Sequence, residues 1–298
     1  MQLVAYGAQD IYLSGNPQIT FFKVVYRRHT NFSMESIEQT FNGQAGFDRK
    51  VTCTISRNGD LISRVYLQAK LTTLGAATDI DYAGHKLIKS VEVEIGGQRI
   101  DKHYGDWLAI WNELTQTAGH WDGYKAMTSL KAASETTIYV PLQFWFCRNP
   151  GLALPLIALQ YHEVKINIEF ASQSTVDPLG TSSVTLDSAS LYVDYIYLDT
   201  DERRRFAQVS HEYLIEQLQF TGDESASSKI KLNFNHPVKE LIWVEQDDDD
   251  GVGEYKSTYS DAKLQLNGHE RFSARAASYF QLVQPYQHHE RVPEADKK

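Results

Sequence analysis

The sequence predicts an all-β protein made of two tandem eight-stranded antiparallel jelly-roll β-sandwiches, the second of them incomplete. Three observations favour this fold. Short apolar segments alternate with polar residues at strand spacing, turn signals separate these segments, and the pattern of the first half begins again after about residue 205. A parallel α/β fold would instead alternate its strands with long helical segments.

Seven segments of the first half have the composition of strands. Val164, Ile166 and Ile168 alternate with polar residues, as in a strand with one buried face. Residues 138–146 are so rich in aromatic side chains that a second sheet must cover them. The segments, residues 36–41, 51–56, 61–71, 87–95, 138–146, 163–170 and 186–198, give the seven or eight strands of a jelly roll.

One segment, residues 106–117, departs from the strand pattern. Trp107, Trp111 and Leu114 lie at helical spacing behind Asp106, a candidate N-cap. We therefore expect a short helix between the strands of the first sandwich, packed on a sheet.

The second half repeats the pattern of the first after the polar run of residues 199–205. Three matches recur after about 170–180 residues: residues 229–234 with 50–55, 241–244 with 64–67, and 262–268 with 91–97. Asn267-Gly268 replaces Gly96-Gly97 as the hairpin signal. We interpret this as a duplicated domain, although three short matches between any two β-sandwiches can arise by coincidence. The predicted parts are an arm at 1–35, a first jelly roll at 36–205 and the early strands of a second at 206–298.

Composition excludes several classes of protein. With 42% hydrophobic and 22% charged residues the chain is globular, and no apolar run is long enough to span a membrane. The net charge of −9 argues against nucleic acid as a direct, sequence-specific partner. Cys53 and Cys147 each lie in a strand-like run, where a buried thiol is expected.

The residues that catalysis or metal binding would need are not in a suitable pattern. Four His-Glu dipeptides lack the second histidine of an HExxH zinc motif. Residues 247–250 form an acidic run before Gly251, but Ser257 stands where a calcium loop needs a carboxylate. A solvated acidic loop fits better, with loose calcium binding as the alternative. The sequence thus predicts no enzyme, no catalytic or metal site and no cofactor.

Two long motifs stand out from the rest of the chain. One is GAQDIYLSGNPQITFFKVVYRRHTNF at residues 7–32, and the other is PLQFWFCRNPGLALPLIALQYHEV at 141–164. Asn267-Gly268, Arg271-Phe272, Tyr279-Phe280 and residues 284–289 join them. With these residues the whole chain resembles the double jelly-roll major capsid proteins of nucleocytoplasmic large DNA viruses.

The resemblance implies a structural protein of the virion, assembled in the cytoplasm of the host cell. Family members form homotrimers whose six jelly rolls make a pseudo-hexagonal capsomer. Capsomers contact one another and minor capsid proteins, and tile an icosahedral shell over an internal membrane. Members continue past the segment that matches Arg291-Val292-Pro293, so this sequence is expected to be a fragment, an incomplete product or a variant completed by a partner. The alternative function is a carbohydrate-binding, lectin-like jelly roll, because lectins share this architecture.

Two segments are candidate assembly surfaces. The arm carries apolar side chains outside the alternating strands, and two basic clusters suit contacts with acidic neighbours. Alternatively, the basic clusters are ordinary surface charges beside strands, with no role in assembly. The candidates are Phe21, Phe22, Tyr26, Arg27, Arg28, Arg203, Arg204 and Arg205.

Overall fold

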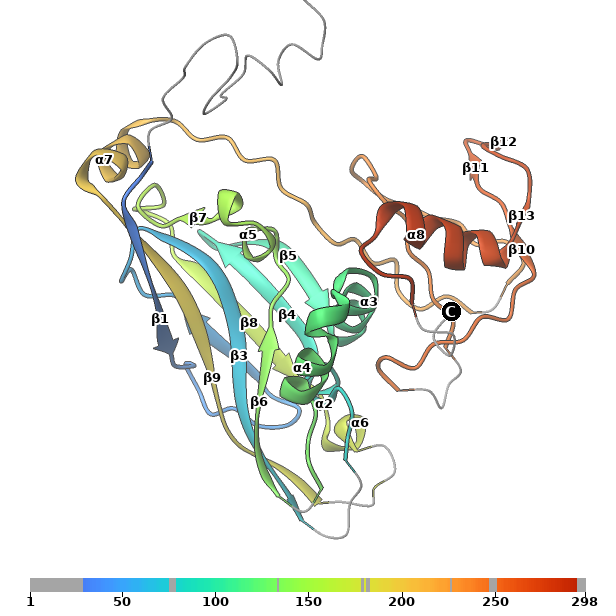
Figure 1. The fold of residues 1–298 in the computed structure, drawn as a ribbon, viewed down its shortest axis with the longest axis horizontal. Helices are drawn as coiled ribbons and strands as arrows, with labels where there is room; N and C mark the ends of the chain where they lie inside the picture. Colours follow the sequence, from blue (N-terminus) through green and yellow to red (C-terminus); the bar gives the residue numbers. More distant parts are fainter. Residues whose placement is uncertain are drawn as a thin grey trace, which may run out of the picture.

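The computed structural model describes residues 29–74, 79–132, 134–177, 180, 183–225, 227–246 and 251–293. In the first half, two antiparallel sheets face each other (Figure 1). One sheet has the order β1-β9-β3-β6, with the two-residue strand β7 beside β3, and the other has the order β2-β8-β4-β5. The bounds are β1 Phe32–Gln39, β2 Lys50–Thr54, β3 Leu61–Leu74, β4 Ile88–Ile95, β5 Gln98–Tyr104, β6 Glu135–Pro141, β7 Leu154–Pro155, β8 Val164–Phe170 and β9 Ser183–Leu198. Two four-stranded sheets in this order make a jelly roll, so the predicted fold class is confirmed.

The apolar residues of the alternating pattern form the inner face of each sheet. In β3 every second side chain from Val65 to Leu71 is buried, while those between them are partly exposed. Strand β8 does the same with Ile166, Ile168 and Phe170. The two inner faces meet in one core, as the period of two residues in a strand requires.

The strand order separates segments that follow one another in the sequence. β9 lies between β1 and β3, and β8 lies between β2 and β4. Among β1 to β5, only β4 and β5 pair with each other. Their hairpin turns at Gly96 (φ 59°) and Gly97 (φ 83°), the two left-handed positions that glycine adopts without strain. Both sheets therefore depend on strands that come late in the sequence.

The aromatic segment corrects one sequence expectation. The strand expected over residues 138–146 ends at Pro141, and a helical turn, α5 (Trp145–Arg148), follows. Phe144, Trp145 and Phe146 are all buried. A strand would have pointed Trp145 to the opposite face from its neighbours, whereas a turn of helix lets all three rings reach the core.

Helices fill the connections of the first half. The helix expected near residues 106–117 is α3 (Gly105–Thr115), followed by α4 (Ala118–Thr128), and the two pack near β5 and β6 (Figure 1). The N-cap assignment was wrong, because the N-cap is Tyr104 and Asp106 lies inside the first turn. There the Asp106 carboxylate accepts a hydrogen bond from the Tyr255 hydroxyl at 3.1 Å. Shorter helices are α2 (Ala83–Leu87), η1 (Pro150–Leu152) and α6 (Gln173–Val176).

The second half is far more open. After α7 (Thr200–Gln208) an extended chain crosses to a lobe, coloured orange to red in Figure 1. Its described ladders are β10 (Asp261–Ala262) with β13 (Arg275–Ala276), and β11 (Gln265–Leu266) with β12 (His269–Glu270). They form one hairpin around Asn267 (φ 52°) and Gly268 (φ 81°), followed by η2 (Tyr279–Val283) and α8 (Gln284–His288). In the duplication inferred from the sequence, this hairpin corresponds to β4 and β5, the one pair of early strands in the first half whose members pair with each other.

The buried aromatic turn yields a test of the core. Replacing Phe144 by Ala removes a ring that is 0% exposed and stacks on Phe146 at 5.9 Å. We expect the free energy of unfolding of the first sandwich to fall by about 3–5 kcal/mol, measured by urea denaturation. The matched control is Tyr161→Ala, at a position 93% exposed, where a change within about 0.5 kcal/mol is expected. Equal effects at the two positions would contradict the described core.

Candidate assembly surfaces

Helix α7 carries the arginine cluster Arg203, Arg204 and Arg205. Asp199 caps the helix by accepting a hydrogen bond from the Glu202 N–H at 3.0 Å. Arg203 binds Asp60 through two hydrogen bonds, from Nε to Oδ1 at 2.9 Å and from Nη2 to Oδ2 at 3.1 Å. Asp60 is buried and also accepts the Leu198 N–H at 2.8 Å. Arg203 therefore fixes α7 to the first sandwich, a role that its place in a run of three arginines does not indicate.

The other two arginines of this cluster remain on the surface. Arg204 and Arg205 are exposed, while Phe206 packs against a small apolar cluster that contains Leu61 and Ile196. The helix is thus held in place with two cations facing solvent. The remaining candidates, Phe21, Phe22, Tyr26, Arg27 and Arg28, lie outside the described residues.

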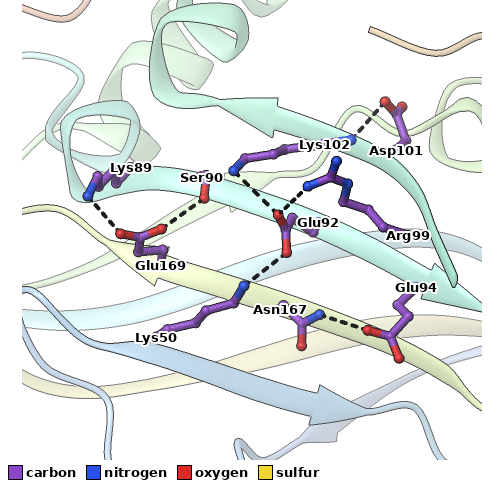
Figure 2. Close-up of polar contacts among 10 residues, drawn as sticks. All are labelled: Lys50, Lys89, Ser90, Glu92, Glu94, Arg99, Asp101, Lys102, Asn167 and Glu169. Atoms are coloured by element: carbon purple, nitrogen blue, oxygen red, sulfur yellow. Dashed lines mark hydrogen bonds and ion pairs between the residues drawn. The ribbon is translucent and has the colours of Figure 1, made fainter. Parts of the chain in front are cut away.

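A network of ion pairs crosses the outer face of the β2-β8-β4-β5 sheet (Figure 2). Glu92 on β4 receives Lys50 from β2 at 3.0 Å, Lys102 from β5 at 3.3 Å and Arg99 from β5 at 3.4 Å. Lys50 reaches Glu92 across the intervening strand β8. Around this centre, Lys89 binds Glu169, and Asn167 donates to Glu94. The face is polar, but its charges are held in fixed positions.

The charge of Glu92 follows from these neighbours. Its partial burial alone would raise the pKa of the carboxyl, but the hydrogen bonds and charges of Lys50 and Lys102 outweigh that effect and lower its pKa. The carboxylate therefore stays ionised, and three cations share it.

The two halves of the chain meet along β5 and α3. The Arg148 guanidinium lies 3.9 Å above the Trp111 ring and pairs with Glu216 of the second half at 3.3 Å. Asp101 Oδ1 accepts the Leu218 N–H at 3.1 Å, while Oδ2 lies 2.9 Å from His103 Nε2. The Arg148–Glu216 and Asp101–Leu218 contacts join side chains of the first sandwich to the segment that follows α7, while Trp111 and His103 hold those two side chains in place.

A second set of contacts holds the end of the described chain to the helices. Arg291 lies 3.3 Å above the Trp121 ring of α4, and its N–H donates to the Leu114 carbonyl at 3.1 Å. His289 packs edge-on against Trp111. Residues 284–289 and Arg291 stood out in the sequence only as motifs, and this contact with α3 and α4 gives them a structural role.

Many large apolar side chains of the second half are exposed. Trp243 packs against Phe280 at 5.2 Å but is still 47% exposed. In the described residues, the segments that match β2 and β3 pair with no strand. Large exposed side chains are Leu214, Phe220, Ile230, Leu232, Val238, Trp243, Val244 and Leu266.

Metal ligands are not gathered in the described part of the chain. Within it, His, Cys, Asp and Glu side chains form no cluster of three or more that could hold a metal, and the acidic run 247–250 lies outside it. His289 instead pairs with Glu240. Burial raises the pKa of the Cys53 thiol to about 11 and that of Cys147 to about 12, so neither is a nucleophile at neutral pH. Each helix in the described ranges is too short or too polar to cross a bilayer.

Comparison with known proteins accounts for both halves. Residues 20–199 match the family described as major capsid protein N-terminus, and residues 202–297 match the large eukaryotic DNA virus major capsid protein. The chain belongs to the major capsid protein family of large DNA viruses. It is 77% identical to the major capsid protein of Pyramimonas orientalis virus, over 98% of this chain and 76% of that protein. It is 47% identical to that of Paramecium bursaria Chlorella virus 1, over 96% of this chain and 77% of that protein.

A solved structure supports the same assignment. A quasi-atomic model of the PBCV-1 virus capsid matches with a TM-score of 0.82 and 43% identity, over 93% of this chain and 79% of that chain. The capsid relatives are structural proteins and not enzymes. The assignment therefore confirms the resemblance read from the sequence and gives the chain a structural role in a viral capsid.

The Glu92 network predicts a pH dependence of stability. The pKa of Glu92 in the folded protein lies below its usual value of about 4.5, so its stabilising contribution is present above that pH and is lost as the pH falls through the lowered pKa. Glu92→Gln should lower the free energy of unfolding by about 1 kcal/mol at neutral pH, and the difference should shrink below about pH 4. Thermal unfolding over this pH range measures it.

The control for this prediction is Glu163→Gln, which removes an exposed pair with Lys165 at 3.2 Å. That change should stay within about 0.5 kcal/mol at every pH. A Glu92→Gln difference that does not depend on pH would contradict the assigned role of the carboxylate.

The open second half predicts where a protease will cut. Trypsin should remove the lobe from a monomeric sample and leave a fragment that ends near Arg205, because the first sandwich is closed and the following segments are exposed. Mass spectrometry of the digest identifies the end of that fragment. A monomer that resists cleavage through residues 209–246 would contradict the open lobe.

Proposed function

We propose that the chain is a self-associating capsid subunit that forms homotrimers, and that these trimers are pseudo-hexagonal capsomers of an icosahedral shell. The observation that carries the proposal is the likeness to the PBCV-1 capsid model, at a TM-score of 0.82. Two jelly rolls in each subunit give six in a trimer, which suits a hexagonal tile. The domain organisation proposed with it is an arm at 1–35, of which Phe32–Glu35 already belong to β1, a first jelly roll at 36–205 and the N-terminal part of a second at 206–298.

The proposed contacts use the apolar residues of the lobe and the basic residues of α7 and the arm. The open apolar lobe is the larger candidate for contacts within a trimer, since it includes Trp243 and Leu266 at about half exposure. Arg204 and Arg205 on the fixed helix α7 suit contacts with acidic neighbours, either other capsomers or minor capsid proteins. The arm residues Phe21, Phe22, Tyr26, Arg27 and Arg28 are proposed for the same role on their sequence alone. Assembly in the host cytoplasm and a shell over an internal membrane complete the proposal.

The carbohydrate-binding alternative rests on shared architecture alone. The relatives that match most of this chain are capsid proteins. We therefore propose no glycan-binding function.

The oligomeric mass tests the proposal. Native mass spectrometry of the chain should give a species at three times 33.9 kDa, with larger particles at higher concentration. In that trimer the lobe should resist trypsin, because its apolar surface is then covered. A sample that stays monomeric at every concentration while the lobe is protected would overturn the proposal.

The arginines of α7 give a second test with a matched control. Arg204→Glu with Arg205→Glu should leave the melting temperature unchanged and weaken association between trimers, measured by light scattering. Arg203→Ala should leave the association between trimers unchanged. It should lower the free energy of unfolding by about 1–3 kcal/mol, because it leaves the buried Asp60 carboxylate without its cation. If the double variant assembles like the parent, α7 is not an assembly contact.

A further inference from the structure

One late strand of the first sandwich holds two early strands together. β8 pairs antiparallel with β2 on one edge and with β4 on the other. It has seven residues, and its apolar side chains Val164, Ile166, Ile168 and Phe170 alternate with polar ones and are buried in the core. A single short strand therefore supplies both the hydrogen bonds and the apolar cover that β2 and β4 need.

The matching segments of the second half have no such strand between them in the described residues. Residues 229–234, which match β2, pair with no described strand and form no backbone hydrogen bond with another described residue. Residues 262–266, which match part of β4, are paired along one edge only, by β12 and β13. Each segment therefore leaves an edge that no described strand occupies.

Equivalent apolar positions are buried in the first half and exposed in the second. Val51 and Cys53 of β2 are 2% and 0% exposed, whereas their matches Ile230 and Leu232 are 50% and 44% exposed. Polar residues separate Ile230, Leu232 and Phe234, as in β2. Residues 229–234 thus have the alternation of a strand without the partner that would cover it.

These free groups select the chemistry of the occupant. A row of unpaired backbone N–H and C=O groups is satisfied by another extended backbone, which carries donors and acceptors at the same spacing. Apolar side chains at every second position take a strand whose own apolar side chains alternate in the same way. A nucleic acid, a glycan or a helix meets neither requirement.

We propose that the lobe binds a short antiparallel strand of another polypeptide, one with the pattern of β8, which pairs with residues 229–234 and 262–266. The template is β8 itself, which joins β2 to β4 in the first half. A second copy of the lobe offers only its own early strands, and in the first half β2 and β4 do not pair with each other. The inference rests on the proposed second jelly roll but not on the trimer, because both acceptor segments belong to one chain.

The test uses the monomeric 298-residue chain and a capped synthetic peptide with the sequence of residues 162–171, HEVKINIEFA. With saturating peptide, hydrogen exchange of residues 229–234 and 262–266 should slow by about tenfold or more, measured by mass spectrometry. Exchange of β2 should not change, because its own β8 is already in place. A peptide of the same composition without alternation, HEKNEVIIFA, should protect neither segment.

A pair of variants tests the apolar contact. Leu232→Asp should weaken binding of the peptide about tenfold, followed by the anisotropy of a fluorescent label on the peptide. Leu214→Asp is the matched control, because Leu214 is 90% exposed and lies outside the segments that match strands. Its affinity should stay within about twofold of the parent. Both side chains are already exposed, so neither variant should change the melting temperature.

Three results would overturn the proposal. These are equal protection by the two peptides, an affinity that Leu232→Asp leaves unchanged, and no protection of residues 229–234 by the alternating peptide. If those residues became protected only as the chain associates with itself, the edge would belong to a second copy instead. The native mass of the chain without peptide tests the capsomer, so this inference and the proposed trimer fail separately.

Discussion

The insertion of late strands between early ones is the constraint on which this fold depends. β9 bridges β1 and β3, and β8 bridges β2 and β4. The partners are far apart in the chain; Thr52 binds Asn167, 115 residues away, across the β2–β8 pair. During folding, each sandwich therefore forms its inter-strand hydrogen bonds and buries its core only when its last strands pair with the early ones. Before that, only the β4–β5 hairpin can form locally.

The same rule explains the contrast between the two halves. In the first half the late strands are present, and the core is closed around Phe144, Phe170 and Tyr195. In the second half the described residues form the β10–β13 and β11–β12 hairpin and one isolated bridge between Glu245 and Lys256, and Trp243 stays half exposed. The chain that follows then binds to the surface of the closed first sandwich. Arg148, Asp101 and the helices α3 and α4 fix the following chain through an ion pair, hydrogen bonds and one cation–π contact, which need no shared sheet.

The sequence predicted what is encoded locally. Alternation in β3 and β8, the left-handed turns at Gly96-Gly97 and Asn267-Gly268, and helix α3 all follow from spacing and residue type. It failed where tertiary contact overrides local pattern, as in the helical turn at Trp145. It also gave no sign of the Arg203–Asp60 pair or of the cations around Glu92, because those depend on the register between strands. The arm candidates, from Phe21 to Arg28, stay predictions.

Hydrogen exchange of the backbone tests the central claim most directly. In the isolated chain we expect strong amide protection in β2, β3 and β4, because late strands pair with each of them. Residues 229–234 and 241–244, which the sequence matches pair with β2 and β3, should exchange at rates close to those of an unfolded chain, with modest protection around Asn267-Gly268. Equal protection in the two halves of a monomer would contradict the account, because it would mean that the early strands close a sandwich without their late partners.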